Sequence, residues 1–324
     1  MLKYLLPFLL FSLNACAATL PHSLSTKYAN GEQFMKIRLH GSVVIPREMG
    51  IGTPVTGLSG LAWDNASNLL YAINDKGMLY YLRPVFEKGL LTDVNVLKNF
   101  PLLNARQKKL RWEYIDSEGT VLVPAQESQS GNPELLVSFE QVPRIVRYSL
   151  DGKWLGEITL PEDLRYPENY RNNNRMLESV TIHPKFGILT APESPLEITD
   201  INTLKIYAMN GTTWEIPHYI APKSGVTDMG VFENGSLLVL ERSFTGLTKP
   251  LIISLRRVWI NEQCESGKSI CQTEQLAVFD NSEGWDIDNF EGLTRHHGNF
   301  FLMVSDDNNN FLQKTLLTYF EVVE

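Results

Sequence analysis

The sequence predicts an all-β protein, namely a β-propeller of four-stranded blades, with five blades favoured and six as the alternative. Three observations lead to this fold class. A short hairpin recurs along the chain, each copy leaves room for two further strands, and no segment of ten or more residues shows a convincing helical period. The composition, with 43% hydrophobic and 20% charged residues, is typical of a soluble globular protein with a sizeable core.

The recurring hairpin begins with a small or acidic residue, continues as two apolar strands joined by a turn, and ends at or near an acid. Its copies cover residues 58–75, 116–140, 177–193, 226–242 and 289–310. Their leading positions follow one another at separations of 59, 60, 50 and 63 residues and are Ser59, Glu118, Glu178, Asp228 and Glu291. A repeat of about this length indicates a propeller, because each repeat forms one blade.

Two further apolar stretches follow each of the first four hairpins and supply the outer strands of those blades. They cover 78–86 and 93–100, 144–150 and 155–160, 204–210 and 212–220, and 251–260 and 274–280. The fifth hairpin is followed only by 315–323, so its missing strand is expected from residues 35–46. We therefore predict that residues 36–324 form one propeller domain, closed by pairing of the N- and C-terminal strands.

Residues 1–22 are typical of a secretory signal, with one lysine, a short apolar stretch and small residues after it, too short to span a membrane. Two cleavage points fit. The run "LNAC" resembles a bacterial lipobox that would leave a lipidated Cys16, whereas "ACA" would serve as an A-x-A site and remove that cysteine. Either way we expect an exported protein, periplasmic or lipid-anchored in a bacterial envelope, with residues 23–35 as a linker.

The other two cysteines lie close together in "CESGKSIC", at Cys264 and Cys271. An isolated pair in an exported chain predicts a disulfide that closes a small loop. The alternative, a zinc site, has fewer ligands than it needs, because no histidine lies near the two thiols.

The predicted fold gathers acidic residues at one end of the central channel. The first strand of each blade lines the channel and the second runs antiparallel beside it, so the start of one and the end of the other lie at the same end. The first strands would contribute Glu118, Glu178, Asp228 and Glu291, and the second strands Asp75, Glu140, Glu193, Glu241 and Asp306. We predict an acidic channel mouth.

Carboxylates this close raise one another's pKa values, and a divalent cation relieves the repulsion. Oxygen ligands favour Ca²⁺, with Mg²⁺ as the second choice. Two alternatives without a metal remain. Acids at strand ends also cap turns, and nearby basic side chains would neutralise part of the ring, namely Arg242, Lys76, Arg175 and Arg144.

Charge and motifs exclude several functions. A net charge of −8 and a pI near 5.4 argue against nucleic acid as a partner. The chain contains no G-x-S-x-G elbow, P-loop or dinucleotide-binding motif. Contact with a membrane is expected only through lipid on Cys16.

Four stretches resemble the phytase-like family described as "esterase-like activity of phytase": "DSEG", "RMLES", "LLVLERSF" and the C-terminal "NFEGL" with "LMVSDDNNNFLQKTLLTYFEV". The resemblance covers about residues 50–322. It implies a β-propeller of an exported bacterial protein with a hydrolytic, phosphoesterase-like activity. Propeller phytases use a channel mouth lined with acids, Ca²⁺ and basic residues, so the resemblance supports calcium as the cofactor.

Three hypotheses about function follow. The first is a Ca²⁺-dependent hydrolase of small-molecule phosphate esters, with Arg242 and Arg175 stabilising negative charge and Glu241 accepting a proton. Its metal ligands would be Glu118, Glu178, Glu291 and Asp306. The second is a propeller lactonase or carboxylic esterase that uses one metal and the same acids. The third is a non-enzymatic envelope scaffold whose channel mouth binds a protein partner.

Overall fold

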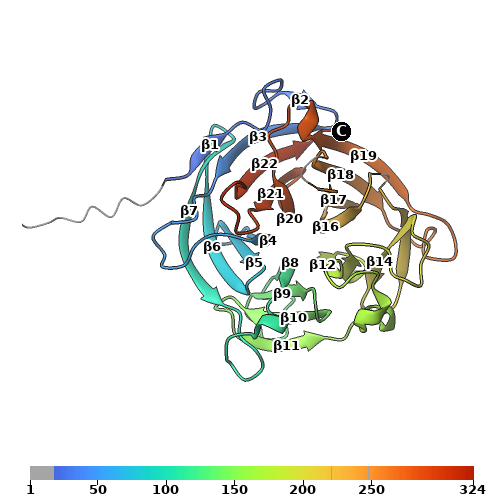
Figure 1. The fold of residues 1–324 in the computed structure, drawn as a ribbon. Helices are drawn as coiled ribbons and strands as arrows, with labels where there is room; N and C mark the ends of the chain where they lie inside the picture. The colour runs from blue at the N-terminus through green and yellow to red at the C-terminus, as the bar shows by residue number, and fades with distance from the viewer. Residues whose placement is uncertain (1–17, 220, 247–248) are drawn as a thin grey trace, which may run out of the picture.

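The computed structural model describes residues 18–219, 221–246 and 249–324 as a five-bladed β-propeller (Figure 1). Five antiparallel sheets surround a central axis, which confirms the all-β fold and the count of five blades. The helices of this part of the chain are single 3₁₀ turns, at Trp112–Tyr114, Glu162–Leu164, Pro167–Asn169 and Asn281–Glu283. None of its helices has the length and apolar character needed to cross a membrane.

In the first four blades the chain runs outward from the axis in sequence order. Blade 1 consists of β4 (Leu58–Asp64), β5 (Leu69–Asn74), β6 (Met78–Glu87) and β7 (Leu90–Pro101). Blade 2 consists of β8 (Ser117–Val123), β9 (Glu134–Phe139), β10 (Arg144–Ser149) and β11 (Trp154–Ile158). Blade 3 consists of β12 (Leu177–His183), β13 (Gly187–Pro192), β14 (Thr203–Ala208) and β15 (Thr213–Pro217). Blade 4 consists of β16 (Ser224–Val231), β17 (Leu237–Ser243), β18 (Ile252–Trp259) and β19 (Gln272–Asp280).

Blade 5 joins the two ends of the chain. Its inner strands are β20 (Asn289–His297), β21 (Phe300–Asp306) and β22 (Leu316–Val322). The N-terminal strand β3 (Ile37–Val44) pairs antiparallel with β22, with Val43 opposite Leu317 and Ile37 opposite Val322. The predicted closure is therefore present, and it gives the last blade the strand that the C-terminal segment lacks.

The segment before β3 belongs to the same sheet. Strand β1 (Leu20–His22) pairs with the outer side of β3, and β2 (Gln33–Phe34) forms a hairpin with it. Leu24 packs in the core between blades 4 and 5. Residues 20–35, expected as the end of the signal and a linker, thus extend blade 5, because their apolar side chains find a buried face there. Cys16 and both predicted cleavage points lie within residues 1–17, outside the described residues.

Five apolar clusters hold the blades together, each between two neighbouring sheets. The strands alternate side chains between their two faces, so the continuous apolar runs of the second and third strands fill both sides of a blade. Trp214, Phe139, Phe301 and Phe320 are among the largest fully buried side chains. Burial of each such side chain stabilises the fold by roughly 1.5–3 kcal/mol.

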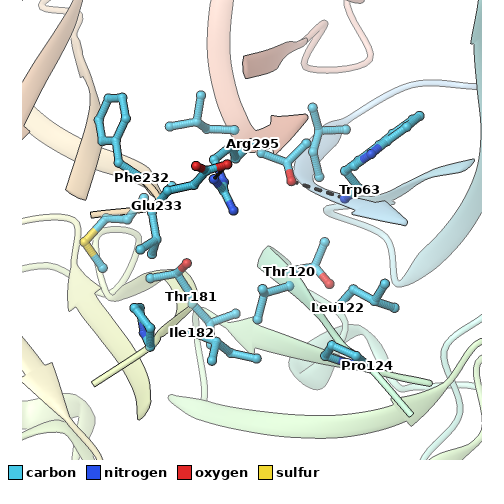
Figure 2. Close-up of a pocket in the computed structure, with 18 of the residues that line it drawn as sticks. Trp63, Thr120, Leu122, Pro124, Thr181, Ile182, Phe232, Glu233 and Arg295 are labelled. Atoms are coloured by element: carbon cyan, nitrogen blue, oxygen red, sulfur yellow. Dashed lines mark hydrogen bonds and ion pairs between the residues drawn. The ribbon is translucent and has the colours of Figure 1, made fainter. Parts of the chain in front are cut away.

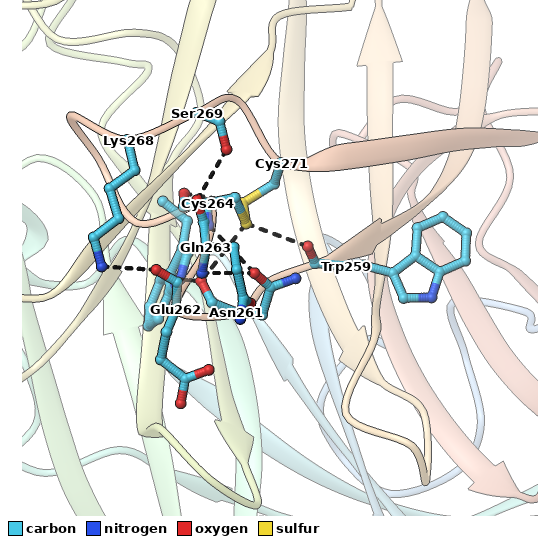
Figure 3. The surroundings of a disulfide bond; sticks show 9 residues. Trp259, Asn261, Glu262, Gln263, Cys264, Lys268, Ser269 and Cys271 are labelled. Atoms are coloured by element: carbon cyan, nitrogen blue, oxygen red, sulfur yellow. Dashed lines mark hydrogen bonds between the residues drawn. A yellow bond between two sulfur atoms is a disulfide. The ribbon is translucent and has the colours of Figure 1, made fainter.

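The disulfide between Cys264 and Cys271 forms as predicted and closes the loop between β18 and β19 (Figure 3). This loop reaches over the outer edge of blade 3. The Cys271 N–H donates to the Glu215 carbonyl at 2.8 Å, and the Trp214 indole donates to the Asn261 carbonyl at 2.9 Å. The loop therefore occupies hydrogen-bonding groups on the otherwise unpaired edge of β15.

Candidate functional site

A β-bulge interrupts the first strand of every blade at the same place. The register against the second strand shifts after Leu58, Ser117, Leu177, Val226 and Phe290. A bulge leaves an extra residue unpaired and re-aims its side chain. The residues so placed form an inner ring around the channel mouth and are Ser59, Glu118, Glu178, Thr227 and Glu291.

Glycines after the bulges let neighbouring first strands approach closely. A Cβ on Gly60 would lie 2.3 Å from the Glu118 carbonyl oxygen, and a Cβ on Gly292 would lie 2.9 Å from the Ser59 carbonyl oxygen. Gly119 packs in the same way against the carbonyl of Glu178. The repeated Glu-Gly pair is thus explained by geometry, because glutamate faces the mouth and glycine permits the contact of two backbones.

A second ring surrounds the first and comes from the second strands. Each member lies opposite the residue two positions before the bulge, and the members are Asp75, Glu140, Glu193, Arg242 and Asp306. In four blades this position carries an acid, as the sequence predicted. In blade 4 it carries an arginine.

Two predicted mouth residues of blade 4 lie one position away from the rings. Asp228 follows the bulge, and its buried carboxylate accepts the Leu293 N–H at 2.7 Å and the Met229 N–H at 2.8 Å. Glu241 points to the other face of β17, where Arg256 binds both of its carboxylate oxygens at 2.7 and 2.5 Å. Asp228 therefore links blades 4 and 5, and Glu241 forms a buried ion pair instead of facing the mouth.

The structure brings five carboxylates of blades 2 and 3 into two overlapping groups. Oxygens of Asp116, Glu118 and Glu140 lie within 4.8 Å of one another, and so do oxygens of Glu140, Glu178 and Glu193. Calcium binds oxygen at 2.3–2.6 Å, so two ligands of one ion lie within about 5 Å of each other. Both groups meet this condition, and they share Glu140.

Glu291 and Asp306, predicted as metal ligands, belong to neither group and lie on the blade 5 side of the mouth. Glu291 accepts from the Asn289 amide at 2.7 Å and contacts Arg242 at 3.0 Å. The Asp306 carboxylate accepts the Asn308 N–H at 2.6 Å. Both are thus already engaged by groups of the protein.

Burial and mutual repulsion raise the pKa values of the mouth acids. The pKa of Asp75 rises to about 6, that of Glu291 to about 7, and those of Glu140 and Asp306 to about 8. For all four, burial is the largest cause. The pKa values of Glu118 and Glu178 are also well above the usual range, through burial first and neighbouring carboxylates second. One buried oxygen, Oδ1 of Asp75, makes no hydrogen bond within the described residues.

Two arginines border the acids on the side of blades 3 and 4. Arg242 lies 3.0 Å from Glu291 and 3.6 Å from Glu193. Arg175 contacts Glu193 at 2.8 Å and donates to the carbonyls of Lys223 and Ser224. Burial lowers the pKa of Arg242, but the surrounding carboxylates outweigh it and raise the pKa overall. Both predicted arginines therefore lie at the mouth.

Next to these arginines is a cavity of about 350 Å³, lined by Asn172, Asn174, Arg175, Glu193, Lys223, Arg242 and Phe244. The loop that carries Arg175 thus covers part of the mouth. The lining is rich in hydrogen-bond donors, and Glu193 connects it to the carboxylate groups. An anion bound here would contact arginine side chains while lying next to the carboxylate oxygens of the second group.

Sequence reasoning missed Asp116 and Asp307. Asp116 lies two residues before Glu118, so its place in "DSEG" was the available signal. Asp307 accepts the Gly57 N–H at 3.0 Å and ties blade 5 to blade 1 across the closure of the ring. No repeat signal marks it, because only blade 5 has a second acid there.

The opposite end of the channel is different in character. Beyond the inner ring, the next inward-facing residues of the first strands are Leu61, Thr120, Val180, Met229 and Leu293, all buried. They open into a cavity of about 450 Å³ that also includes Trp63, Ile182 and Phe232 (Figure 2). An ion pair of 3.0 Å between Arg295 and Glu233 lies at its rim. The acidic mouth is therefore separated from this end by an apolar layer.

Comparison with solved structures finds similar chains at low sequence identity. A PQQ-bound aldose sugar dehydrogenase from Streptomyces coelicolor is 10% identical, with a TM-score of 0.44, over 90% of this chain and 100% of that one. The propeller domain of Myceliophteria thermophila Cps50 (Swd1) is 11% identical, with a TM-score of 0.38, over 94% and 98%. No curated protein matches.

Comparison with protein families gives a more specific result. The model of the phytase-like family, described as esterase-like activity of phytase, matches residues 53–309. This span runs from the approach to the first bulge through the two acids that end β21, so it includes both rings of the mouth. The chain belongs to the phytase-like family described as esterase-like activity of phytase.

Proposed function

We propose that the protein is an exported, calcium-dependent hydrolase of small phosphate esters that acts at the acidic mouth. The observation that carries the proposal is the position of Glu193. Its carboxylate belongs to one of the two groups that can ligate a cation, and it also contacts Arg175 and Arg242. A phosphate ester needs both kinds of neighbour, because its oxygens bind metal and arginine together.

The residues at the mouth fit a hard cation. All the donors are carboxylate oxygens, which Ca²⁺ prefers over softer metals. Burial first, and neighbouring carboxylates second, raise the pKa values of Glu118 and Glu178, so the protein compensates their ionised forms poorly and a cation would do so. We assign the binding of calcium to Asp116, Glu118, Glu140, Glu178 and Glu193.

Calcium, when bound, would supply positive charge next to the phosphoryl oxygens. Arg242 and Arg175 would hold the other phosphoryl oxygens and stabilise the charge that develops on them. Glu291 would accept the proton of the attacking water, because it lies beside Arg242 and its raised pKa of about 7 suits a general base. Glu291 thus takes the role that we first gave to Glu241, whose carboxylate is held by Arg256.

The proposed export is supported by the disulfide, because such bonds persist in oxidising compartments. Lipid on Cys16 remains part of the proposal as the route to a membrane anchor. The test is labelling with a lipid precursor in a bacterial host, with a Cys16→Ser variant as the control.

The function is tested by treating the purified protein with chelator and titrating Ca²⁺, Mg²⁺, Mn²⁺ and Zn²⁺. The melting temperature and the hydrolysis of an aryl phosphate are followed at each step. We expect Ca²⁺ to raise the melting temperature and the rate of hydrolysis. Glu178→Gln should abolish both of these responses. Glu233→Gln, at the opposite end of the channel, is the matched control and should respond as the unmodified protein does.

The outcomes separate the hypotheses. Absence of any cation effect would exclude a metal-dependent hydrolase. A cation effect with opening of lactones, and without phosphate release, would assign the site to a lactonase instead. If neither substrate class reacts and a protein partner is captured through the mouth, the chain is a binding propeller.

A further inference from the structure

Three of the six histidines gather around one tyrosine, near the opposite end of the channel from the acidic mouth. Tyr319, on β22, is 3% exposed, and its ring lies near those of His40 and His296. The His296 Nδ1 atom lies 2.9 Å from the Tyr319 hydroxyl, and the His297 Nε2 atom lies 3.3 Å from the same oxygen. Two nitrogens thus converge on one oxygen.

This convergence requires a distorted strand. Consecutive residues of a regular strand point to opposite faces. Here the register of β20 against β21 shifts between Arg295 and His297, so that His296 forms a bulge. The two imidazole rings lie 4.5 Å apart between centroids and face the same side. A bulge that re-aims a side chain is a frequent feature of binding sites.

Aromatic rings hold the three groups in place. Phe86 stacks on His296 at 5.1 Å, and Phe300 stacks on Tyr319 at 5.4 Å. Trp63 meets the edge of His296 at 4.5 Å. His297 remains exposed, so the group is open to solvent on one side. The arrangement therefore combines preformed donors with a route of entry.

We propose that His296, His297 and Tyr319 form a second metal site, which takes a borderline divalent cation such as Cu²⁺ or Zn²⁺. The nitrogens of His296 and His297 lie 2.9 and 3.3 Å from the Tyr319 oxygen. These separations match the distances between ligands of a cation that binds nitrogen and oxygen at about 2.0–2.2 Å. Two imidazoles and a phenolate favour copper and zinc over calcium. On binding, the cation replaces the hydroxyl proton of Tyr319, and this proton passes to water.

The site is independent of the proposed hydrolase. Its donors are softer than the carboxylates of the mouth, and the apolar layer of the channel lies between the two. His40 offers a matched control, because its ring lies against the same tyrosine at 6.0 Å while its Nε2 atom faces Glu321 at 3.3 Å.

The test is titration of the chelator-treated protein with Cu²⁺ alone, read by calorimetry and by electron paramagnetic resonance. All variants carry Glu140→Gln, because Glu140 is the carboxylate that both groups of the mouth share. Coupling to nitrogen then distinguishes an ion at the histidines from an ion on the remaining carboxylates. We expect one saturable ion per chain with hyperfine coupling to two nitrogens. Tyr319→Phe, which removes only the hydroxyl, should abolish the visible charge-transfer band of a copper-bound phenolate.

His297→Ala should weaken binding by about tenfold or more, since loss of even an outer-shell partner costs that much. This residue is exposed, so the fold should be retained, which circular dichroism verifies. His40→Asn should leave the affinity unchanged. Equal affinity in His297→Ala and the parent protein, or an equal loss in His40→Asn, would overturn the proposed ligand set.

Discussion

The two ends of the central channel are built from the same five strands, yet one end is acidic and the other is apolar. At the acidic mouth, three of the five inner positions are glutamates, and four of the five surrounding positions are acids. Two residues further along each strand, the inward positions are apolar or threonine. The change from acidic to apolar therefore takes place within two residues of each first strand.

The bulge is what separates the two ends. At the bulge, the unpaired residue of each strand presents a polar side chain to the mouth. After it, the regular alternation resumes and fills the channel mainly with apolar side chains. The acids thus stand on a rigid layer that cannot compensate their charge. The apolar end therefore acts as a rigid scaffold. The acidic end gathers carboxylates whose charge is poorly compensated, which is expected of a binding or catalytic site.

The largest expected effect is loss of activity on changing Arg242. Arg242→Met removes the cation that contacts both Glu291 and Glu193, and with it a donor to the developing negative charge. We expect kcat/KM for phosphate esters to fall about 100- to 1,000-fold, as for loss of a comparable donor. Steady-state kinetics with saturating Ca²⁺ measures this.

Arg295→Met at the opposite end is the control and should retain full activity. Equal losses in the two variants would contradict the assignment of chemistry to the acidic mouth.

Next in size is the effect of Leu293→Ala on stability. Leu293 is 2% exposed in the apolar layer, so its truncation should lower the free energy of unfolding by roughly 2–5 kcal/mol. Urea denaturation measures the change. In chelator, Glu178→Gln should shift stability in the opposite direction, because it removes a carboxyl group whose ionised form is disfavoured by burial and by neighbouring carboxylates. If both variants destabilise the metal-free protein equally, the two ends do not differ as described.

A smaller effect concerns pH. Because the folded state raises the carboxyl pKa values to about 6 for Asp75, about 7 for Glu291 and about 8 for Glu140 and Asp306, it favours their protonated forms. Protonation of these carboxyls therefore contributes to the free energy of unfolding. The contribution is complete below the ordinary carboxyl pKa of about 4 and is lost as pH rises through about 6 to 8.

In chelator, the melting temperature should therefore fall between pH 5 and pH 8.5, buffers chosen to bracket roughly that window. Saturating Ca²⁺ should flatten the curve, because it compensates the ionised carboxylates. A melting temperature that rises with pH in chelator would refute this account of the mouth.

The smallest effect is expected for the ion pair at the rim of the apolar end. The Glu233 side chain is 72% exposed, so its contact with Arg295 is strongly screened by solvent. Glu233→Gln should change the free energy of unfolding by less than about 1 kcal/mol. A much larger change in urea denaturation would show that this end also depends on electrostatics.

The blades could be predicted from sequence because each strand is short, apolar and bounded by turn residues, and because the hairpin recurs. The mouth could be predicted only in part. In blade 4, the sequence predicts Asp228 and Glu241 at the mouth. The two rings instead contain their neighbours Thr227 and Arg242. A bulge shifts the register by one residue, and its place cannot be inferred from an alternation that it interrupts.

Other features depend on tertiary contacts that leave no local pattern. The segment before β3 resembled a linker because it is short and polar, yet Leu24 and Phe34 complete a core made mainly by blades 4 and 5. The convergence of His296 and His297 on Tyr319 likewise depends on a bulge in β20, which no local sequence pattern marks.

The pairing of β3 with β22 has a consequence for how the chain folds. Val43 and Leu317 are neighbours in the finished sheet, although nearly the whole domain lies between them in the sequence. Contacts of such high sequence separation form slowly, because the entropy of a very long loop must be lost first. Strand β3 therefore waits for its partner β22 until the end of synthesis. Until they meet, blade 5 exposes an unpaired edge, and the nascent protein depends on protection from aggregation for its whole passage out of the ribosome.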